Sequence, residues 1–379
     1  MNASFRTACA VLLMSGWLSM GYAQTLPEPT GQESLSRVEV SAKADADERP
    51  YQRFVKAMEL FDAERPALAP QSNLRFHLDA KRRSARVDAL KLTLTGTTVR
   101  APVALTPEHF FTVERNELAL REDATVRSNR KEDSFNWSVD VRTPGLAANT
   151  RRLGDLRLQC RVELLAANLG RRIFSPLYYA QTAAGADPCT FRNLTILAMG
   201  DEPIFTVTLV DGARRQVLPV SSLYGGSLPA WVKALAGDWP GRDRVYELPL
   251  WDASWPHDTL VELEPMRAAP AAVTEAEPPP AAEALQSVTR ADLARWLIEG
   301  QTSATVLQGV FGSPEVVQFA NGDASWVFRS ETGSGKLLSL IPIVGTLLKP
   351  ERTLKELHVL VGADGTVRQY RLEEMVLRL

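Results

Sequence analysis

The sequence predicts an α+β protein with a β-rich, sandwich-like N-terminal domain behind a leading helix, then a linker, then a small C-terminal domain of helices and strands. Three observations predict this class. Short alternating segments divided by Gly, Pro, Asn or Asp follow one amphipathic helix, a Pro/Ala/Glu-rich stretch then interrupts the composition, and two helix patterns with two hairpin signals come last. Helices segregated to one face of an antiparallel sheet define the α+β class.

The composition is that of a globular protein with a hydrophobic core. Of 379 residues, 45% are hydrophobic, and 43 Lys and Arg balance 45 Asp and Glu to a formal charge of −2. A nucleic-acid-binding domain requires a clearly basic surface. We therefore expect no nucleic-acid partner.

The first 23 residues have the pattern of a secretory signal peptide. Arg6 precedes an apolar run over residues 8–17, and Gly21-Tyr22-Ala23 supplies the small residues that a signal peptidase reads. We expect cleavage near Ala23 and export of the chain. Cys9 lies at the start of the apolar run and not at its end, so no lipid anchor is expected.

Ordered structure is expected to begin near residue 50. Residues 24–49 are polar and broken by Pro, which is typical of a disordered leader. A helix is predicted from Tyr51 until Pro66 stops it. One face of this helix is apolar and is expected to pack on a sheet: Tyr51, Phe54, Val55, Met58 and Phe61.

Residues 50–264 are predicted to form one β-rich domain or two subdomains. In KLTLT the leucines face one side and the threonines the other, as in an antiparallel strand with one wet face. The spacing of such segments favours a β-sandwich. The predicted strands are LRFHL, ALKLTLTGT, FFTV, FNWSVDV, LRLQCRVELL, IFTVTLV and RRQVLPV.

Cys160 and Cys189 are the cysteines that remain after the expected cleavage. In an oxidising compartment such a pair usually forms a disulfide. Closing this loop would stabilise the fold by about 3–4 kcal/mol in the chain-entropy model. Two separately buried thiols are the alternative. No His or second Cys stands at ligand spacing beside either one, so we expect no metal site and no cofactor.

A linker at residues 265–287 precedes the C-terminal domain, residues 288–379. The linker is rich in Pro, Ala and Glu and has almost nothing to bury. Thr289 and Asp292 then form a capping box for a first short helix, and Gly300 is placed to end it.

A second helix and two hairpins follow. Thr302 is expected to cap the helix, Gly312 to stop it, and Pro314 to prevent its continuation. Asn321-Gly322 is the strongest short hairpin signal, and Asp364-Gly365 marks another turn between strand-like segments.

Taken in order, these residues resemble the SmpA/OmlA family of small outer-membrane lipoproteins, the BamE-like fold. The family pattern is Ile-x-Gly-x-Thr, then Val, then Gly-x-Pro, then Trp-x-aromatic, then a strand ending in Asp-Gly-x-Val. The resemblance covers residues 288–375 and implies an α-α-β-β-β domain. The matching residues are Ile298, Gly300, Thr302, Val306, Gly312, Pro314, Trp326, Phe328, Asp364, Gly365 and Val367.

The resemblance also implies a location and a role. Family members sit at the inner face of the outer membrane, and the best known supports the machine that inserts β-barrel proteins, binding partner subunits and anionic lipid. For this chain it implies a periplasmic protein whose partner is an outer-membrane or periplasmic assembly protein, with peripheral lipid contact left open. A large unrelated domain precedes the matching region, so the assembly role does not transfer automatically. The same fold also serves as a protein-inhibitor scaffold.

An apolar run, KLLSLIPIVGTLLK, lies between two strands of this region. As a helix its apolar part would span about 18 Å, well short of the roughly 30 Å hydrocarbon layer. It either packs inside the domain or forms a surface loop that contacts lipid or a partner groove. The residues of the second interpretation are Leu337, Leu338, Leu340, Ile341, Ile343, Val344, Leu347 and Leu348.

One bend, PLWDASWPHDTLVE, concentrates aromatic and acidic residues. Trp251, Asp252, Trp255 and Asp258 either form an edge that binds sugar or peptide, or close the end of the sandwich while the aspartates cap turns.

No residue set commits the chain to a reaction. The histidines at 77, 109, 257 and 358 are scattered, and His77 and His358 lie in predicted strands, where a polar side chain is expected to face outward. Neither Gly-x-Ser-x-Gly nor His-Glu-x-x-His occurs, although a Ser-His-Asp set drawn from distant positions is not excluded.

We therefore expect no catalytic residue and no enzyme activity. The first functional hypothesis is an interaction or scaffold role at the outer membrane, in assembly or maintenance of its proteins. The second is a periplasmic binding or inhibitor module that recognises a protein, peptide or glycan through the β-rich domain.

Overall fold

The described fold begins at Ala46, four residues before the expected start of order at residue 50. The computed structural model describes residues 46–81, 88–169, 185–192, 196–228, 230, 233, 241–268, 280, 285–332 and 351–378. These residues all belong to one compact unit. The expected signal peptide and the apolar run at 337–348 lie outside the described residues.

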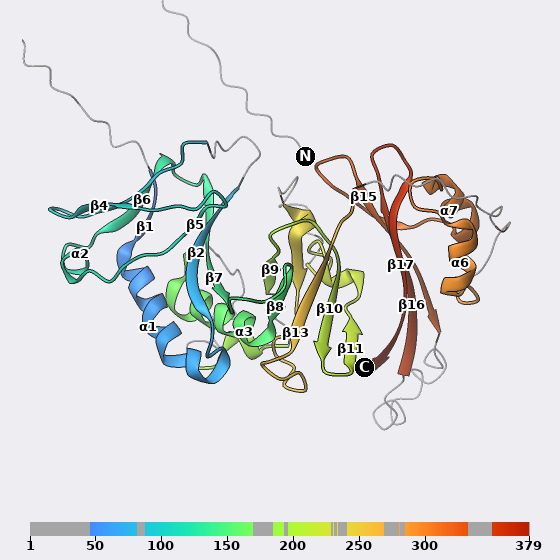
Figure 1. The fold of residues 1–379 in the computed structure, drawn as a ribbon, viewed down its shortest axis with the longest axis horizontal. Coiled ribbons are helices and arrows are strands. Elements are labelled where there is room, and N and C mark those ends of the chain that lie inside the picture. The colour runs from blue at the N-terminus through green and yellow to red at the C-terminus, as the bar shows by residue number, and fades with distance from the viewer. Residues whose placement is uncertain are drawn as a thin grey trace, which may run out of the picture. The chain divides into compact units, whose positions relative to one another are not determined.

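Residues 46–142 form two antiparallel sheets around one long helix (Figure 1). The strand orders are β1-β6-β3-β4 and β5-β2-β7, and the strands predicted in this region are confirmed. The elements are β1 (Ala46–Pro50), α1 (Tyr51–Leu68), β2 (Asn73–Ala80), β3 (Leu92–Thr95), β4 (Arg100–Val103), β5 (Phe110–Phe111), α2 (Glu117–Arg121), β6 (Thr125–Lys131) and β7 (Phe135–Arg142).

The apolar face of α1 packs on β2 and β7, as its spacing predicts. The Phe54 ring meets Phe76 edge-on at 4.8 Å between centroids, and it meets Trp137 at 6.2 Å. The helix continues past Pro66 to Leu68, two residues beyond the predicted end. Pro66 lies in the last turn, where the loss of its N–H removes one helical hydrogen bond without breaking a longer helix.

Residues 150–265 add two further antiparallel sheets, β11-β10-β13-β8 and β12-β9. The α+β class is confirmed, with the strands of residues 46–265 distributed over four small sheets. The elements are β8 (Thr150–Arg152), α3 (Leu153–Arg161), the π-helix η1 (Val162–Ala167), η2 (Pro188–Thr190), β9 (Leu197–Met199), β10 (Ile204–Asp211), β11 (Arg214–Val217), η3 (Val220–Ser222), η4 (Arg242–Arg244), β12 (Val245–Glu247) and β13 (Leu260–Pro265).

The segment LRLQCRVELL is helical, so the predicted strand is wrong at this place. It forms most of α3 and the start of η1. Its polar residues alternate with apolar ones as in a strand, but Arg157 and Glu163 are buried and bond to backbone groups of other elements. Because nearly every side of this helix is buried, its sequence lacks the period of 3.6 residues by which an amphipathic helix is recognised.

The C-terminal region forms its own core between two helices and one antiparallel sheet. Both helices cover one face of the sheet β14-β15-β16-β17, which has one strand more than the family pattern (Figure 1). The elements are α6 (Arg290–Trp296), α7 (Ala304–Phe311), β14 (Glu315–Gln318), β15 (Ala324–Thr332), β16 (Glu351–Val361) and β17 (Val367–Arg378).

The local signals of this region are largely confirmed. The capping box of Thr289 and Asp292 is present. Gly312 ends α7 with a φ of 82°, and Gly322 and Gly365 occupy the two hairpin turns with φ of 90° and 78°. Positive φ is the backbone conformation that glycine adopts without steric cost.

The joint between α6 and α7 differs in detail from the prediction. Helix α6 ends at Trp296, so Gly300 lies in the turn after it, and its N–H donates to the Val367 carbonyl at 2.6 Å. Ser303 caps α7. Thr302 instead accepts the Ile298 N–H at 2.8 Å and donates to the Trp296 carbonyl at 3.0 Å.

The face of this sheet that points away from the helices packs into the second core, formed mainly by residues 153–266. The ring of His358 stacks on Phe205 at 4.3 Å, and Tyr224 meets Phe319 at 5.0 Å. His358 is only 3% exposed, so its expected outward position is wrong. Both faces of β15 and β16 are therefore covered.

Candidate functional site

A cavity of about 970 Å³ lies between the polar face of the β5-β2-β7 sheet and strand β9, with α3 and η1 lining it as well. One wall carries polar and charged side chains, and the rest of the lining is mainly apolar but includes Gln159, Glu163 and Arg244. The polar wall includes Arg75, His77, Asp79, Asn136, Ser138, Asp140, Arg142 and Asp201. The apolar wall includes Leu156, Leu164, Ile196, Leu197, Met199, Leu228, Val245, Leu248 and Leu250.

The register of β2 and β7 builds the polar wall. Arg75 lies opposite Asp140, His77 opposite Ser138, and Asp79 opposite Asn136. Side chains two residues apart in a strand point to the same face, so these partners share one face of the sheet. The alternate residues, such as Phe76 and Trp137, face α1 and the first core.

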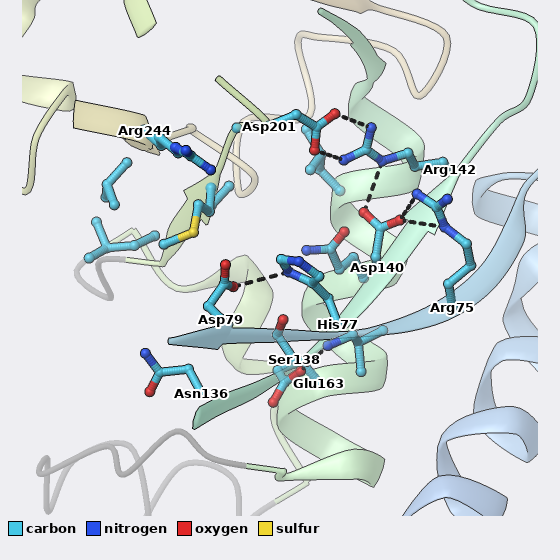
Figure 2. A pocket seen from close by; sticks show the side chains of 18 of the residues that line it. Arg75, His77, Asp79, Asn136, Ser138, Asp140, Arg142, Glu163, Asp201 and Arg244 are labelled. Atoms are coloured by element: carbon cyan, nitrogen blue, oxygen red, sulfur yellow. Dashed lines mark hydrogen bonds and ion pairs between the residues drawn. The ribbon is translucent and has the colours of Figure 1, made fainter. Parts of the chain in front are cut away.

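Four charged residues form a continuous chain along this wall (Figure 2). Arg75 donates to Asp140 Oδ2 through Nε at 3.0 Å and Nη2 at 2.7 Å. Arg142 Nε donates to Asp140 Oδ1 at 3.0 Å, and its two terminal nitrogens donate to the Asp201 carboxylate at 2.5 and 2.6 Å. Arg151 Nη2 approaches Asp140 Oδ1 to 3.6 Å.

The three arginines keep the buried Asp140 ionised. Burial raises the pKa of this carboxyl, but the guanidinium groups of Arg151, Arg142 and Arg75 outweigh burial and hold the pKa below its usual range. Burial likewise disfavours the charge of Arg142, whereas its bonds to Asp201 and the charge of Asp140 raise its pKa. Asp140 and Arg142 are therefore both charged at neutral pH.

His77 occupies the centre of the wall without completing a catalytic triad. Its Nδ1 lies 3.1 Å from Asp79, and its Nε2 lies 2.9 Å from the Glu108 carbonyl oxygen. Ser138 is its cross-strand neighbour. In a Ser-His-Asp triad Nε2 must face the serine hydroxyl, but here this nitrogen bonds to a backbone carbonyl.

The half-buried aromatic ring on this wall is already covered. Phe110 of β5 stacks with His77 at 4.3 Å between centroids, and the Arg75 guanidinium lies 4.0 Å from the ring centroid. Trp137, the other large aromatic residue of the lining, is buried. Neither ring therefore offers a free face to a ligand.

Helix α3 and η1 close the outer edge of β7 beside the cavity. Gln159 Oε1 accepts the Val141 N–H at 3.1 Å, and Glu163 Oε2 accepts the Val139 N–H at 2.8 Å. Unpaired N–H groups at a sheet edge otherwise invite another strand. These two N–H groups of the β7 edge are thus satisfied by side chains of the same chain.

The predicted disulfide lies at the apolar side of the cavity. Cys160 of α3 and Cys189 of η2 are bonded, with 6.0 Å between their Cα atoms, and Cys160 lines the cavity. The bridge holds α3, whose Leu156 forms part of the apolar wall, and η1 follows directly with Leu164 in the same wall.

The predicted binding edge is placed apart from the cavity lining. Trp255 is 1% exposed and belongs to the second core, whereas Trp251 is 37% exposed with Arg192 over its ring. Asp252 caps Ser254 N–H at 2.9 Å, and Asp258 pairs with Arg152 at 3.0 Å.

Arg157 explains the shape of this bend. Its guanidinium donates to the carbonyl oxygens of Leu250 at 2.9 Å, Asp252 at 2.7 Å and Trp255 at 3.0 Å. The bend is therefore fixed around one buried cation, which the sequence did not indicate.

The residues of the family pattern serve the C-terminal fold. Trp326 packs against the third core, Gly300 and Val367 join the helix turn to the last hairpin, and Gly312 with Pro314 carries the chain from α7 to β14. None of these residues lines the cavity.

Within the described residues, no group of three His, Cys, Asp or Glu is placed to hold a metal ion. No helix in this part of the chain is long and apolar enough to span a membrane. Comparisons with family models, curated proteins and solved structures found no match. The resemblance of residues 288–375 to BamE-like proteins therefore stays a prediction.

Sequence reasoning missed the charged wall, although a signal for it exists. The wet faces of LRFHLDA and FNWSVDVR carry Arg, His and Asp where a plain solvent-facing strand often carries Thr or Ser. Two strands that both carry charged residues on their wet faces indicate a shared polar face when they pair. Nothing in the sequence relates Asp201 to them.

Proposed function

We propose that this protein is a non-enzymatic binding protein of the cell envelope that holds an amphiphilic small molecule in the cavity. The observation that supports it is the two-sided lining, with a charged wall on β2 and β7 and a mainly apolar wall on α3, η1 and β9. Ligand sites commonly measure about 300–1,000 Å³, and the cavity lies within that range. A ligand with an apolar body and a polar end would match both walls. Its body would contact the apolar wall and its polar end the charged wall, so no polar group would be buried against apolar side chains.

The same geometry argues against the other ligand classes considered for the β-rich region. A glycan is usually held against a free aromatic face, but Arg75 and His77 cover the Phe110 ring. An extended peptide could add to an open strand edge, but Gln159 and Glu163 occupy the edge of β7. An amphiphile needs neither feature.

The envelope location in this proposal depends on residues 1–23, which have the pattern of a signal peptide, and on the BamE-like resemblance. Peripheral contact with the outer membrane and the absence of a lipid anchor are proposed on the same grounds.

Fluorescence titration of the full-length protein with the neutral probe N-phenyl-1-naphthylamine tests the cavity. Leu164→Asp places a carboxylate in the apolar wall, whereas Leu165→Asp changes the neighbouring side chain, which is 45% exposed and does not line the cavity. We expect the first variant to weaken binding by about tenfold or more, because a buried unpaired charge is costly. Met199→Asn is a second, milder change of the same wall. Equal binding by the wild type and all three variants would refute the proposal.

A second function, the scaffold role, is favoured because residues of the family pattern that are distant in the sequence bond to one another in the C-terminal region. The N–H of Gly300 bonds to the Val367 carbonyl, and the Val367 N–H bonds to the Thr302 carbonyl at 2.9 Å. We propose that the C-terminal region binds an outer-membrane or periplasmic assembly protein. Affinity capture by the full-length protein from envelope extract should recover such a component, and recovery of none would remove this role.

A further inference from the structure

Arg142 presents a preformed site for an anionic group at the cavity wall (Figure 2). Its Nε is fixed by Asp140, which Arg75 in turn holds through two hydrogen bonds. Its two terminal nitrogens point together at one carboxylate. A guanidinium fixed in this way matches any group that offers two coplanar oxygens.

The carboxylate that occupies this site is the exchangeable member of the cluster. Asp201 follows Gly200 at the end of β9, its side chain is 48% exposed, and within the described residues its hydrogen bonds go to Arg142 alone. The side chain of Asp140, by contrast, is 8% exposed and contacts three arginines. Asp201 is the most exposed side chain of the cluster, so it is the member that a solute can reach and replace.

The cluster is cationic once Asp201 has left. The guanidinium groups of Arg75, Arg142 and Arg151 then surround a single carboxylate, Asp140. An anion that binds Arg142 would therefore lie beside a cluster of three guanidinium groups and one carboxylate.

We infer that the ligand is an anionic amphiphile whose carboxylate or phosphate group replaces Asp201 on Arg142. Its aliphatic body lies along the apolar wall that includes Leu156, Leu164 and Met199. This inference rests on the proposed function and specifies the ligand class of the same cavity. Asp201 then acts as a built-in competitor that occupies the site when the cavity holds no ligand.

Calorimetric titration of the full-length protein with four C12 amphiphiles below their micellar concentrations tests the inference. Dodecanoate and dodecyl phosphate carry the proposed head groups, dodecyl maltoside is neutral, and dodecyltrimethylammonium is cationic. We expect both anions to bind more tightly than the other two, and the comparison between them shows which head group the site prefers.

Two variants and one control locate the head group. Asp201→Asn should tighten anion binding by about fivefold, which corresponds to removal of a competing pair worth about 1 kcal/mol. Arg142→Gln should weaken anion binding by about tenfold and leave the maltoside unchanged, because a bidentate charged contact is lost. Arg215 on β11 pairs with Glu262 and does not line the cavity. Arg215→Gln should therefore leave the affinity for all four amphiphiles unchanged.

The gain expected from Asp201→Asn cannot arise from misfolding, so this variant decides the matter if Arg142→Gln is unstable. Binding of all four amphiphiles with similar affinity, or no tightening in Asp201→Asn, would overturn the inference and leave the proposed function standing. Failure of all four to bind would overturn both.

Discussion

The carboxylate of Glu163 accepts the backbone N–H of Val139 at 2.8 Å, although one residue lies on a π-helix and the other on a strand. This contact is one of three that repeat along the continuous helix α3–η1 and along β7 with the residue that follows it. Four residues of helix rise about 6 Å and two residues of strand about 6.6 Å, so one helix face keeps step with every second N–H of β7. The three pairs are Asp155 with Thr143, Gln159 with Val141, and Glu163 with Val139.

The first pair of this series predicts the cost of opening the edge. Asp155 accepts both the N–H and the hydroxyl of Thr143, at 2.7 and 2.9 Å, and is fully buried. Asp155→Ala should lower the free energy of unfolding by about 1–3 kcal/mol, because a buried N–H loses its acceptor. Asp155→Asn keeps an acceptor oxygen and should cost less. Urea unfolding measures both, and equal losses would contradict the role of the carboxylate as an edge cap.

Asp155 also predicts a pH dependence. Burial raises its pKa, only partly offset by the hydrogen bonds from Thr143. The folded protein therefore retains a proton that the unfolded chain has already released, and the free energy of unfolding falls as pH rises from the ordinary pKa of Asp to the raised one. Asp155→Asn should remove this contribution. A wild-type minus variant difference that is constant across the acidic range would refute it.

His358 predicts the opposite slope. Burial, with Arg329 nearby, lowers its pKa to about 3, whereas an unfolded histidine titrates near 6.5. As pH falls between these values the unfolded chain gains a proton that the folded protein does not, and the free energy of unfolding drops by up to about 1.4 kcal/mol per pH unit. His358→Phe preserves stacking on Phe205 and should remove this slope. Parallel stability curves for the two proteins would contradict this account.

The disulfide between Cys160 and Cys189 should stabilise the fold by about 3–4 kcal/mol, because it closes a loop in the unfolded chain. The double replacement of both cysteines by serine should lower the free energy of unfolding by that amount. Reductant should destabilise the wild type and leave the double variant unchanged. A wild type that is insensitive to reductant would show that the bridge contributes nothing.

Arg157→Lys should loosen the bend at residues 250–257. An ammonium cannot reach all three carbonyl oxygens that the guanidinium contacts, and each charged hydrogen bond contributes about 1.5–3 kcal/mol. We expect a loss of about 2 kcal/mol or more together with faster quenching of Trp255 fluorescence. Arg214→Lys is the comparison, since Arg214 covers the Trp255 ring at 3.5 Å but donates to the backbone of the bend at one carbonyl, that of Ser254 at 2.8 Å. Similar losses in both variants would count against the special position of Arg157.

Local chemistry explains what the sequence could predict. The capping box at Thr289, the turn at Asn321-Gly322 and the apolar face of α1 each depend on residues within a few positions of one another. Such signals depend on the local sequence and not on which distant segments pack against it. They are the reason that the class and the C-terminal hairpins were predictable.

Features that join distant segments were not predictable in this way. The charged wall requires β2 to meet β7 in one register and Asp201 to reach Arg142 from 59 residues away. Helix α3 was taken for a strand because its buried polar residues satisfy backbone groups of other elements. His358 was expected outside because the second core that covers it comes from residues 153–266.

Methyl NMR of the full-length protein labelled at methionine tests the central claim most directly. Met199 lies on β9 and lines the cavity, whereas Met58 packs against the first core and serves as the control. On titration with dodecanoate below its micellar concentration, we predict a saturable shift of the Met199 methyl signal with the Met58 signal unchanged. A Met199 signal that stays in place, or one that moves only together with Met58, would contradict binding of an amphiphile in the cavity.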